Sequence, residues 1–367
     1  MNKTNKENQS KTTIIDVARY SGVSVATVSR VINNKSDVRD ETCNRVLQSI
    51  IELNYVPNTA ARSLKKGKDG LNNEKTNNAV GLIAYESIRS SPYFIHILNG
   101  VEHELTSNGF NCIYSQIRDK RLQNLETANE YHLIKLLTKG EFDGIIAVSI
   151  IDNKLAELFK KSKLPLVLID SNDFGDDIDY VNADNKGGAR KAISYLISIG
   201  HKRIAFLREC GDSWFFNDLE EGYIQALTEN SMLYDPSLVK SAENIIEEVF
   251  IIIDELLGME DPPTAIFTND ITAIMLMNAV KEKGLKVPED ISIMGFDDID
   301  AASYLNSSLT TVQVPKNEIG AIAARRIIEH IKSKSNLIPM RSVLGTKLVI
   351  RKSTAVRGER KISNLKT

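Results

Sequence analysis

The chain has little of what metal centres, disulfide frameworks and membrane anchors require. It has 367 residues and three cysteines, Cys43, Cys112 and Cys210, which form no CxxC pair. So sparse and odd a number predicts reduced thiols and no zinc site. The polar N-terminus lacks the apolar core of a signal peptide, and no apolar run reaches the ~20 residues of a membrane helix. We therefore expect a cytoplasmic protein with no membrane partner.

Enzymatic motifs are also missing. The sequence contains no GxxxxGK[ST] phosphate loop, no GxGxxG after a strand and no GxSxG nucleophile elbow. Its five histidines never take the HExxH spacing of a zinc protease. The acidic stretch at residues 170–179 places Phe174 where a calcium loop needs an oxygen. We therefore predict a protein that is not an enzyme and has no cofactor or metal.

The net charge of −2 conceals an uneven distribution. Residues 1–68 contain 12 Lys and Arg against 6 Asp and Glu, whereas the remainder contains 34 against 42. A basic N-terminal part on an acidic body indicates that the N-terminal part meets phosphate groups. Nucleic acid is the partner that this asymmetry favours.

The N-terminal part shows the pattern of three short helices. Apolar residues recur at helical spacing over residues 13–21, 25–33 and 41–53. Gly22 permits a tight turn between the first two helices, and Ser24 is an N-cap residue before the second. Two short helices joined by a glycine turn, the second with small, polar and basic residues, are typical of a DNA-binding helix-turn-helix.

From residue 79 onward, short apolar strands alternate with amphipathic helices. Residues 65–78 contain one apolar residue, Leu71, and are typical of a flexible linker. Buried strands alternating with helices predict parallel sheets covered on both faces. The predicted fold is a small all-α helix-turn-helix head plus an α/β body of two doubly wound parallel-sheet subdomains. The expected strands are 80–85, 111–116, 144–148, 166–170, 203–207, 264–268 and 291–296, and the helices include 94–107, 186–199 and 271–283.

Several ordered motifs resemble those of one family. The segment from Asp16 to Asn33 reads D-V-A-x-x-x-G-V-S-x-x-T-V-S-R-V-I-N, and Asn54-Tyr55-x-Pro57-Asn58 and Ala61-Arg62-Ser63-Leu64 follow it. The body adds Pro92-Tyr93-Phe94, Phe142-Asp143-Gly144, Gly200-His201-Lys202-Arg203, Gly295-Phe296-Asp297-Asp298 and Leu309-Thr310-Thr311-Val312. From about residue 12 to residue 355, the chain resembles the lactose/galactose repressor family of bacterial transcription regulators.

The resemblance implies a sequence-specific regulator, most often a repressor of sugar uptake or catabolism genes. By resemblance it is a homodimer on a near-palindromic operator in double-stranded DNA, and a small-molecule effector changes its operator affinity. The implied domains are a disordered tail (1–11), the head (12–57), a hinge helix (58–66), a flexible linker (67–78), a periplasmic-binding-protein-like body (79–356) and a tail (357–367). Within the body we expect subdomain 1 at 79–183 and 299–333, and subdomain 2 at 184–298 and 334–356.

The second helix offers side chains for reading DNA. Val25 and Ala26 are small and apolar and suit a thymine methyl group, whereas Arg30 suits the two acceptors of guanine. We expect Val28 and Val31 to pack within the head. By resemblance, Leu64 in the hinge helix inserts into the minor groove. The residues expected to contact DNA are Thr13, Ser24, Val25, Ala26, Thr27, Ser29, Arg30, Asn33, Asn58, Ala61 and Leu64.

The resemblance implies an effector cleft between the subdomains. Ligands of doubly wound sheets bind beyond the carboxyl ends of the strands. Aromatic rings there stack on a sugar or base, and carboxylates and amides bind hydroxyl or N–H donors. We expect Asp298, unlike Asp297, to have a structural role. The residues expected to bind the effector are Tyr93, Phe94, Asp170, Phe215, Asn269 and Asp297.

Two features depart from the family pattern. The arginine expected three residues before Gly222 is Leu219, which removes a planar guanidinium, and Phe215 in a nearby aromatic run is a candidate replacement. A second expected aromatic aligns with Asn244. These changes argue against any one specific sugar and against an anionic effector, and a neutral sugar or glycoside remains the leading expectation. The linker before Val80 is longer than the family pattern, which predicts weaker coupling between the effector and DNA.

Other functions fit parts of this pattern. A nucleobase, a nucleoside or another metabolite is an alternative effector, and a global carbon-catabolite regulator is an alternative role. A nonspecific, nucleoid-type DNA binder would show no effector dependence. A periplasmic solute receptor would need a secretion signal and no basic head.

Overall fold

A computed structural model describes ten stretches of the chain, which form two compact units. The described residues are 12–32, 38–53, 55, 77–117, 136–137, 141–150, 153–171, 174–209, 214–333 and 337–357. The first unit comprises Met1–Ser90, Val101–Tyr180 and Ile322–Met340, and the second comprises Ser91–Gly100, Val181–Ala321 and Arg341–Thr367. The predicted tail at 1–11, the hinge helix at 58–66 and most of the linker and C-terminal tail lie outside the described residues.

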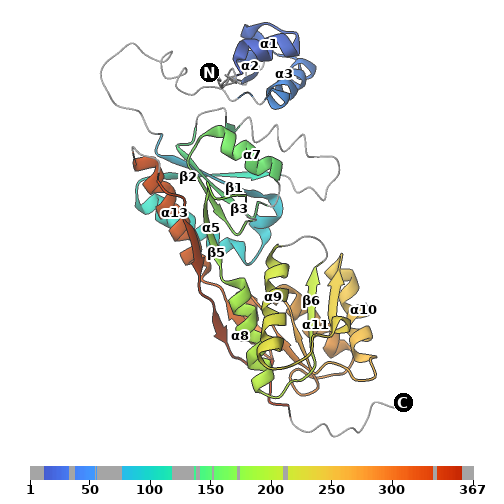
Figure 1. The fold of residues 1–367 in the computed structure, drawn as a ribbon. Coiled ribbons are helices and arrows are strands. Elements are labelled where there is room, and N and C mark those ends of the chain that lie inside the picture. Colours follow the sequence, from blue (N-terminus) through green and yellow to red (C-terminus); the bar gives the residue numbers. More distant parts are fainter. Residues whose placement is uncertain are drawn as a thin grey trace, which may run out of the picture. The chain divides into compact units, whose positions relative to one another are not determined.

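Three short helices form the head (Figure 1). They are α1 (Ile14–Ser21), α2 (Val25–Ile32) and α3 (Asp40–Glu52). Gly22 ends α1 with a φ of 64°, a left-handed conformation that costs other residues roughly 1–2 kcal/mol and here allows the tight turn into α2. The three predicted helices are confirmed. Apolar faces of all three meet in a small core that includes Val17, Val28, Val31, Val46 and Ile50.

The first sheet has six strands, most of which belong to the first unit, in the order β11-β5-β4-β3-β1-β2. β1 pairs in parallel with β2 and β3, and β3 pairs in parallel with β4. β1 is buried along its whole length, as a strand covered by helices on both faces requires. The strands are β1 (Ala79–Tyr85), β2 (Asn111–Ile117), β3 (Gly144–Val148), β4 (Leu166–Ile169), β5 (Asp179–Ala183) and β11 (Arg341–Leu344).

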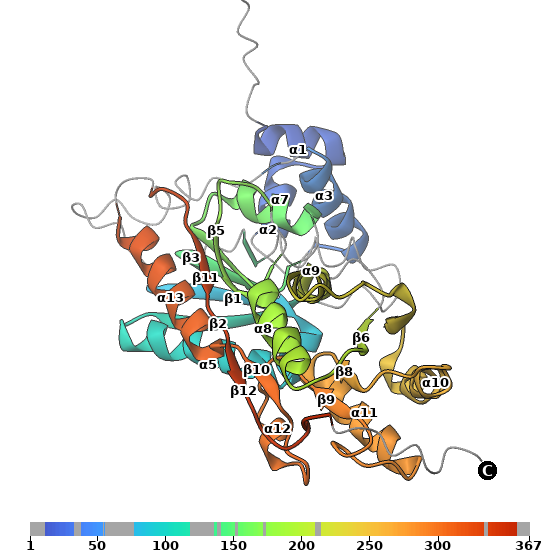
Figure 2. The same ribbon diagram turned by 60° about the horizontal axis from the view of Figure 1, so that its bottom comes forward.

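Helices α5 and α13 lie side by side next to this sheet (Figure 2). Arg325 Nη1 and Glu104 form an ion pair of 2.8 Å between them. Gly100 permits this approach, because a Cβ there would lie 2.2 Å from the Asn317 carbonyl oxygen. The remaining elements around the sheet are η1 (Glu86–Ser90), α5 (Phe94–Ser107), α7 (Asn153–Ser162) and α13 (Lys316–Lys332).

The second unit contains a four-stranded parallel sheet in the order β7-β6-β8-β9. Helix α8 packs with α9 on one side of it, and α10 packs with α11 on the other (Figure 1). A separate antiparallel pair joins β10 to β12. The strands are β6 (Ile204–Glu209), β7 (Val239–Ala242), β8 (Ala265–Phe267), β9 (Ser292–Met294), β10 (Thr311–Gln313) and β12 (Lys347–Val349). The helices are α8 (Asn185–Ser198), α9 (Trp214–Glu229), η2 (Pro236–Leu238), α10 (Ile245–Leu257), α11 (Asp270–Glu282) and α12 (Ala301–Tyr304).

The two units divide the chain at other positions than the expected subdomains. We expected subdomain 1 to resume at residue 299 and end at 333, whereas the first unit resumes at Ile322 and ends at Met340, and Ser91–Gly100 fall in the second unit. Two hydrogen bonds join the start of the intervening segment to other parts of the second unit. Ile299 N donates to Asp270 Oδ2 at 2.8 Å, and Gly295 N donates to the Thr310 carbonyl at 2.9 Å.

Three observations, on membrane-spanning helices, metal-binding groups and cysteines, hold for the described residues. Among them, no helix combines the length and apolarity needed to cross a membrane. In the same part of the chain, no group of three or more His, Cys, Asp or Glu side chains is placed to hold a metal ion. Cys43 and Cys112 are free thiols, and burial raises the pKa of Cys112 to about 11.

Candidate DNA-binding head and effector site

Ser24 caps the start of α2, as predicted. The Thr27 backbone N–H donates to Ser24 Oγ at 3.0 Å, and the two side-chain oxygens lie 2.9 Å apart. This bond satisfies one of the N–H groups that a helix N-terminus leaves without a partner. The cap therefore fixes the end of α2 that is predicted to approach DNA.

Helix α2 separates a buried face from an exposed one. Val28 is 0% exposed and Val31 2% exposed, which confirms their packing role. On the other face, Val25 is 41% exposed and Ala26 and Arg30 are exposed. Thr27 and Ser29 are half-buried. The predicted DNA-contacting residues of α2 thus lie on the face that the core of the head does not use.

The remaining predicted DNA residues have different outcomes. Thr13 is the N-cap of α1 and forms a reciprocal capping box with Asp16. Its hydroxyl donates to Asp16 Oδ2 at 2.7 Å, and this bond lowers the pKa of Asp16. Thr13 therefore has a structural role as a helix cap, and its contact with DNA stays a prediction. Asn33, Asn58, Ala61 and Leu64 lie outside the described residues.

In the second unit, the structure brings Tyr93, Phe94 and Asp297 into one neighbourhood. The Tyr93 and Phe94 rings meet edge to face at 4.8 Å between centroids, at the start of α5. Lys316 Nζ lies 5.8 Å from the Tyr93 ring centroid and donates to the Asp297 backbone carbonyl. Lys316 was not predicted from the sequence. The sequence feature that could have indicated Lys316 is its place at the first position of a helix, directly after Pro315.

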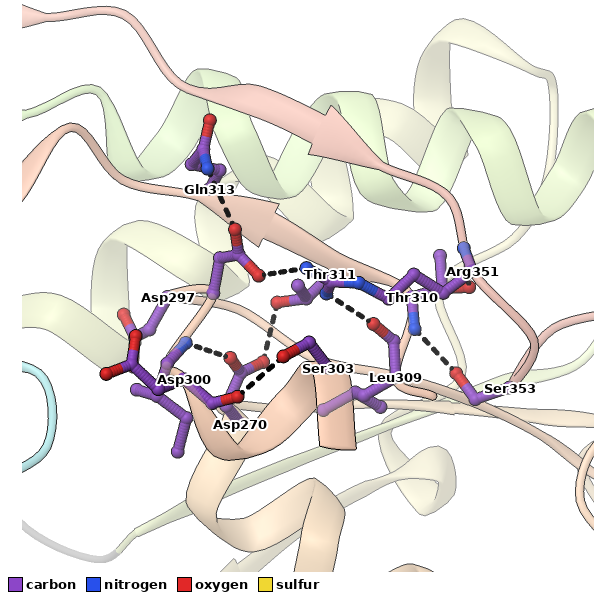
Figure 3. A network of polar contacts seen from close by, with 12 residues as sticks. Asp270, Asp297, Asp300, Ser303, Leu309, Thr310, Thr311, Gln313, Arg351 and Ser353 are labelled. Atoms are coloured by element: carbon purple, nitrogen blue, oxygen red, sulfur yellow. Dashed lines mark hydrogen bonds and ion pairs between the residues drawn. The ribbon is translucent and has the colours of Figure 1, made fainter. Parts of the chain in front are cut away.

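Asp270 is a second residue that sequence reasoning missed (Figure 3). We predicted its neighbour Asn269, whose side chain caps α11 by accepting from Thr272 N at 2.9 Å and whose effector role stays a prediction. The Asp270 carboxylate is fully buried and accepts from Thr311 Oγ1 at 2.5 Å and from Ile299 N at 2.8 Å. Burial raises the pKa of Asp270 to about 7, against the effect of these hydrogen bonds.

Asp298 has the structural role that we expected. Arg351 Nη2 binds Asp298 Oδ1 at 2.7 Å, and Gln313 Nε2 donates to Asp298 Oδ2 at 2.8 Å. The same arginine donates to the Leu309 carbonyl at 2.8 Å. These bonds join the loop after β9 to the segments around β10 and β12.

The other predicted effector residues are Phe215 and Asp170. Phe215 is half-buried in the first turn of α9 and packs edge to face on Phe296, with centroids 5.7 Å apart. Phe296 directly precedes Asp297, so Phe215 lies near the same loop. Asp170 follows β4 with a φ of 50° and is 7% exposed. It belongs to the first unit, and its effector role stays a prediction.

Known families match both parts of the chain. A family described as bacterial regulatory proteins, lacI family, matches residues 13–58, and a periplasmic binding protein-like domain matches residues 193–354. The HTH-type transcriptional repressor PurR of Pasteurella multocida (strain Pm70) is 34% identical over 350 residues, which cover 94% of this chain and 99% of that protein. The chain belongs to the LacI family of bacterial regulatory proteins.

Solved structures agree with the LacI-family assignment. A transcriptional regulator CelR–cellobiose complex has a TM-score of 0.70 and 28% identity and covers 94% of this chain and 100% of that chain. The lac repressor dimer bound to operator and the anti-inducer ONPF has a TM-score of 0.64 and 25% identity, with coverages of 94% and 100%. The predicted helix-turn-helix head and periplasmic-binding-protein-like body are confirmed. This LacI-family chain is a DNA-binding transcriptional regulator, not an enzyme.

The LacI-family arginine position is filled by a core residue. Leu219 is 0% exposed, and it lies on α9, where α9 packs against α8. Gly222 permits that packing, because a Cβ there would lie 2.3 Å from the Lys186 carbonyl oxygen. At the adjacent position, burial raises the pKa of Asp218 to about 6, with the charge of Glu221 acting in the same direction. Acidic side chains thus flank Leu219 on α9.

Asn244, at the second departure from the LacI-family pattern, has a local structural role. It is the N-cap of α10, and its Oδ1 accepts from Ile246 N at 3.3 Å. The Glu248 carboxylate in turn accepts from Asn244 N at 2.7 Å. The position at which we expected an aromatic side chain is thus the N-cap of α10.

Proposed function

We propose that the chain is a repressor that binds a near-palindromic operator as a homodimer, in the cytoplasm, and responds to a neutral sugar or glycoside. The observation that carries the DNA-binding half is α2, which is capped by Ser24 and presents Val25, Ala26 and Arg30 on its exposed face. A capped helix N-terminus and an exposed arginine suit phosphate and base contacts in the major groove. The similar lac repressor structure is a dimer bound to operator, which supports a dimer here.

The effector half of the proposal rests on the carboxyl ends of the strands in the second unit. Tyr93 and Asp297 lie there around Lys316 Nζ, and they combine an aromatic ring with a carboxylate. Carboxylates accept hydrogen bonds from hydroxyl groups, and an aromatic face packs on the apolar face of a sugar ring. Leu219 is buried, and Arg208 at the carboxyl end of β6 is bound by Glu220 at 2.6 Å and Asn217 at 2.8 Å, which favours a neutral ligand over an anion. The similar CelR structure is a complex with cellobiose, which supports a sugar.

A purine-type effector is the second candidate. The observation that favours it is the 34% identity to a PurR repressor along almost the whole chain. The aromatic pair Tyr93–Phe94 would stack on a base as readily as on a sugar. A binding panel that contains both neutral sugars and nucleosides distinguishes the two candidates.

The test of DNA binding uses the full-length chain. Selection from a random DNA library gives a binding sequence, and fluorescence anisotropy then compares wild type with Arg30→Ala. We expect the substitution to weaken binding to the selected sequence by ~1–3 kcal/mol and to relax preference at one base pair of each half-site. Arg190→Ala is the control, since Arg190 lies on α8 in an ion pair with Glu229. Equal weakening on all sequences would make Arg30 a phosphate contact.

The test of the effector is thermal shift against neutral sugars, sugar acids and nucleosides. A ligand at 100 times its Kd stabilises the folded chain by ~2.7 kcal/mol, which is readily measured. Stabilisation by a neutral sugar supports the proposal. Stabilisation by nucleosides alone would replace the sugar with a purine-type effector.

A further inference from the structure

Lys316 is a buried lysine at a place that disfavours its charge. It is the first residue of α13 and 7% exposed. The positive end of the helix dipole repels an ammonium group, and burial removes its hydration. Burial accordingly lowers the pKa of Lys316, while the carboxylates of Asp297, Asp298, Asp270 and Asp300 act in the opposite direction. A cation in this position requires specific partners.

The partners of Lys316 come from two separate segments. Its Nζ donates to the backbone carbonyl of Asp297 and, at 3.0 Å, to that of Asp298. The Tyr93 ring centroid lies 5.8 Å from the same nitrogen, a distance typical of a cation–π contact. An ammonium group has three N–H donors, and two of them are bound to carbonyls. One side chain therefore connects Tyr93 to the loop after β9.

The loop that Lys316 binds has an unfavourable backbone. Asp297 has a φ of 116° and Asp298 a φ of 54°, and both values lie in the region that favours glycine. The Asp298 side chain is fixed by Arg351 and Gln313, and Asp297 N donates to the Val312 carbonyl at 2.8 Å. These bonds leave the two carbonyls facing the ammonium group. Lys316 thus stabilises a turn that non-glycine residues rarely adopt.

We propose that Lys316 is the positioning residue of the effector site, holding the Asp297–Asp298 turn and the Tyr93 ring in the arrangement that binds the ligand. This inference rests on the proposed function, because it concerns the same site. It also narrows the ligand class. The carboxylates of Asp297, Asp298, Asp270 and Asp300 act on the charge of Lys316 and oppose the binding of an anion at this place. The site suits a neutral ring with hydroxyl donors for Asp297 and an apolar face for Tyr93.

The first test needs no ligand. Amide hydrogen exchange in the full-length chain reports on Asp297 N and Ile299 N, both of which are hydrogen-bonded. Lys316→Met is expected to raise exchange at these two amides by at least about 10-fold, whereas Lys316→Arg retains donors for both carbonyls and restores most of the protection. Lys332→Met is the matched control, because Lys332 lies on the same helix, 5.8 Å from the Phe110 ring centroid. Unchanged exchange in Lys316→Met would overturn the proposal.

The second test uses cellobiose, ribose, galacturonate and adenosine as probes. For each probe that stabilises the wild type, calorimetry then compares Kd values for the variants. The proposal predicts at least about a 10-fold weaker Kd in Lys316→Met, recovery in Lys316→Arg and no change in Lys332→Met. Equal affinity in wild type and Lys316→Met would overturn it, as would tight binding of galacturonate alone. If no probe stabilises the wild type, the sugar effector of the proposed function fails, and amide exchange alone decides the role of Lys316.

Discussion

Replacing Asp270 with asparagine should abolish one component of the pH dependence of stability. Asp270 is fully buried, and its two oxygens accept hydrogen bonds from Thr311 and from the Ile299 N–H. An asparagine has the shape of the protonated carboxyl. Its carbonyl oxygen accepts from the Ile299 N–H, and its NH₂ group donates to the Thr311 hydroxyl. The substitution therefore keeps both hydrogen bonds and removes the charge.

The magnitude follows from the pKa. Burial raises the pKa of Asp270 from 3.8 to about 7. A carboxyl that ionises more easily in the unfolded chain makes stability fall as the pH rises between those two values. At 1.36 kcal/mol per pKa unit, the interval corresponds to about 4 kcal/mol. This contribution is fully present below about pH 4 and lost above about pH 7.

Urea unfolding at pH 4 to 8 measures this effect. Trp214, the one tryptophan of the chain, begins α9 and reports fluorescence from the second unit. The free energy of unfolding of Asp270→Asn minus that of wild type should rise by about 4 kcal/mol from pH 4 to pH 8, because other titrating groups cancel in the difference. Thr311→Val removes a hydrogen bond that lowers the pKa of Asp270. The fall of stability with rising pH should therefore extend to higher pH in this variant than in wild type. Parallel pH profiles for wild type and Asp270→Asn would refute the reasoning.

Three further predictions concern other parts of the chain. Ser24→Ala removes the cap of α2 and should destabilise the head by ~1 kcal/mol, measured by thermal unfolding, with Ser29→Ala as the comparison. Asp179→Ala removes the carboxylate that accepts from Arg326 Nε at 3.1 Å and from Met340 N, and should cost about 3 kcal/mol in urea unfolding, far more than a surface pair. Deleting residues 69–75 from the linker should strengthen the effector response of operator binding, and an unchanged response would show that the linker has no part in coupling.

Local patterns predicted much of the fold. The apolar periodicity of the head placed Val28 and Val31 in its core, and burial confirms both. The strand at 144–148 and the helix at 94–107 agree with β3 and α5 to the residue. These segments are long or strongly apolar, so the pattern of apolar residues within each segment is enough to predict its secondary structure.

The features that could not be predicted depend on contacts between residues distant in the sequence. β10 and β12 have three residues each and are defined by their pairing with each other, which leaves no local pattern to recognise. The segment after β9 is bound to α11 by the hydrogen bond from Ile299 N to Asp270, 29 positions apart in the sequence, which no local pattern reveals. The sequence also does not distinguish the roles of the adjacent residues Asn269 and Asp270, because only the folded structure shows that Asn269 caps α11 and that Asp270 is buried. Lys316 acquires its role from Tyr93 and the Asp297–Asp298 turn, which are distant in sequence.

The measurement that tests the central proposal most directly is the mutual effect of operator and effector on each other's binding. Anisotropy gives the operator Kd of the full-length chain with and without a saturating sugar that stabilises it, and calorimetry gives the sugar Kd with and without operator. Linkage requires both constants to change by the same factor, and we predict a factor of roughly 5–150, corresponding to 1–3 kcal/mol of coupling. An operator Kd that the bound sugar leaves unchanged would contradict the proposed function.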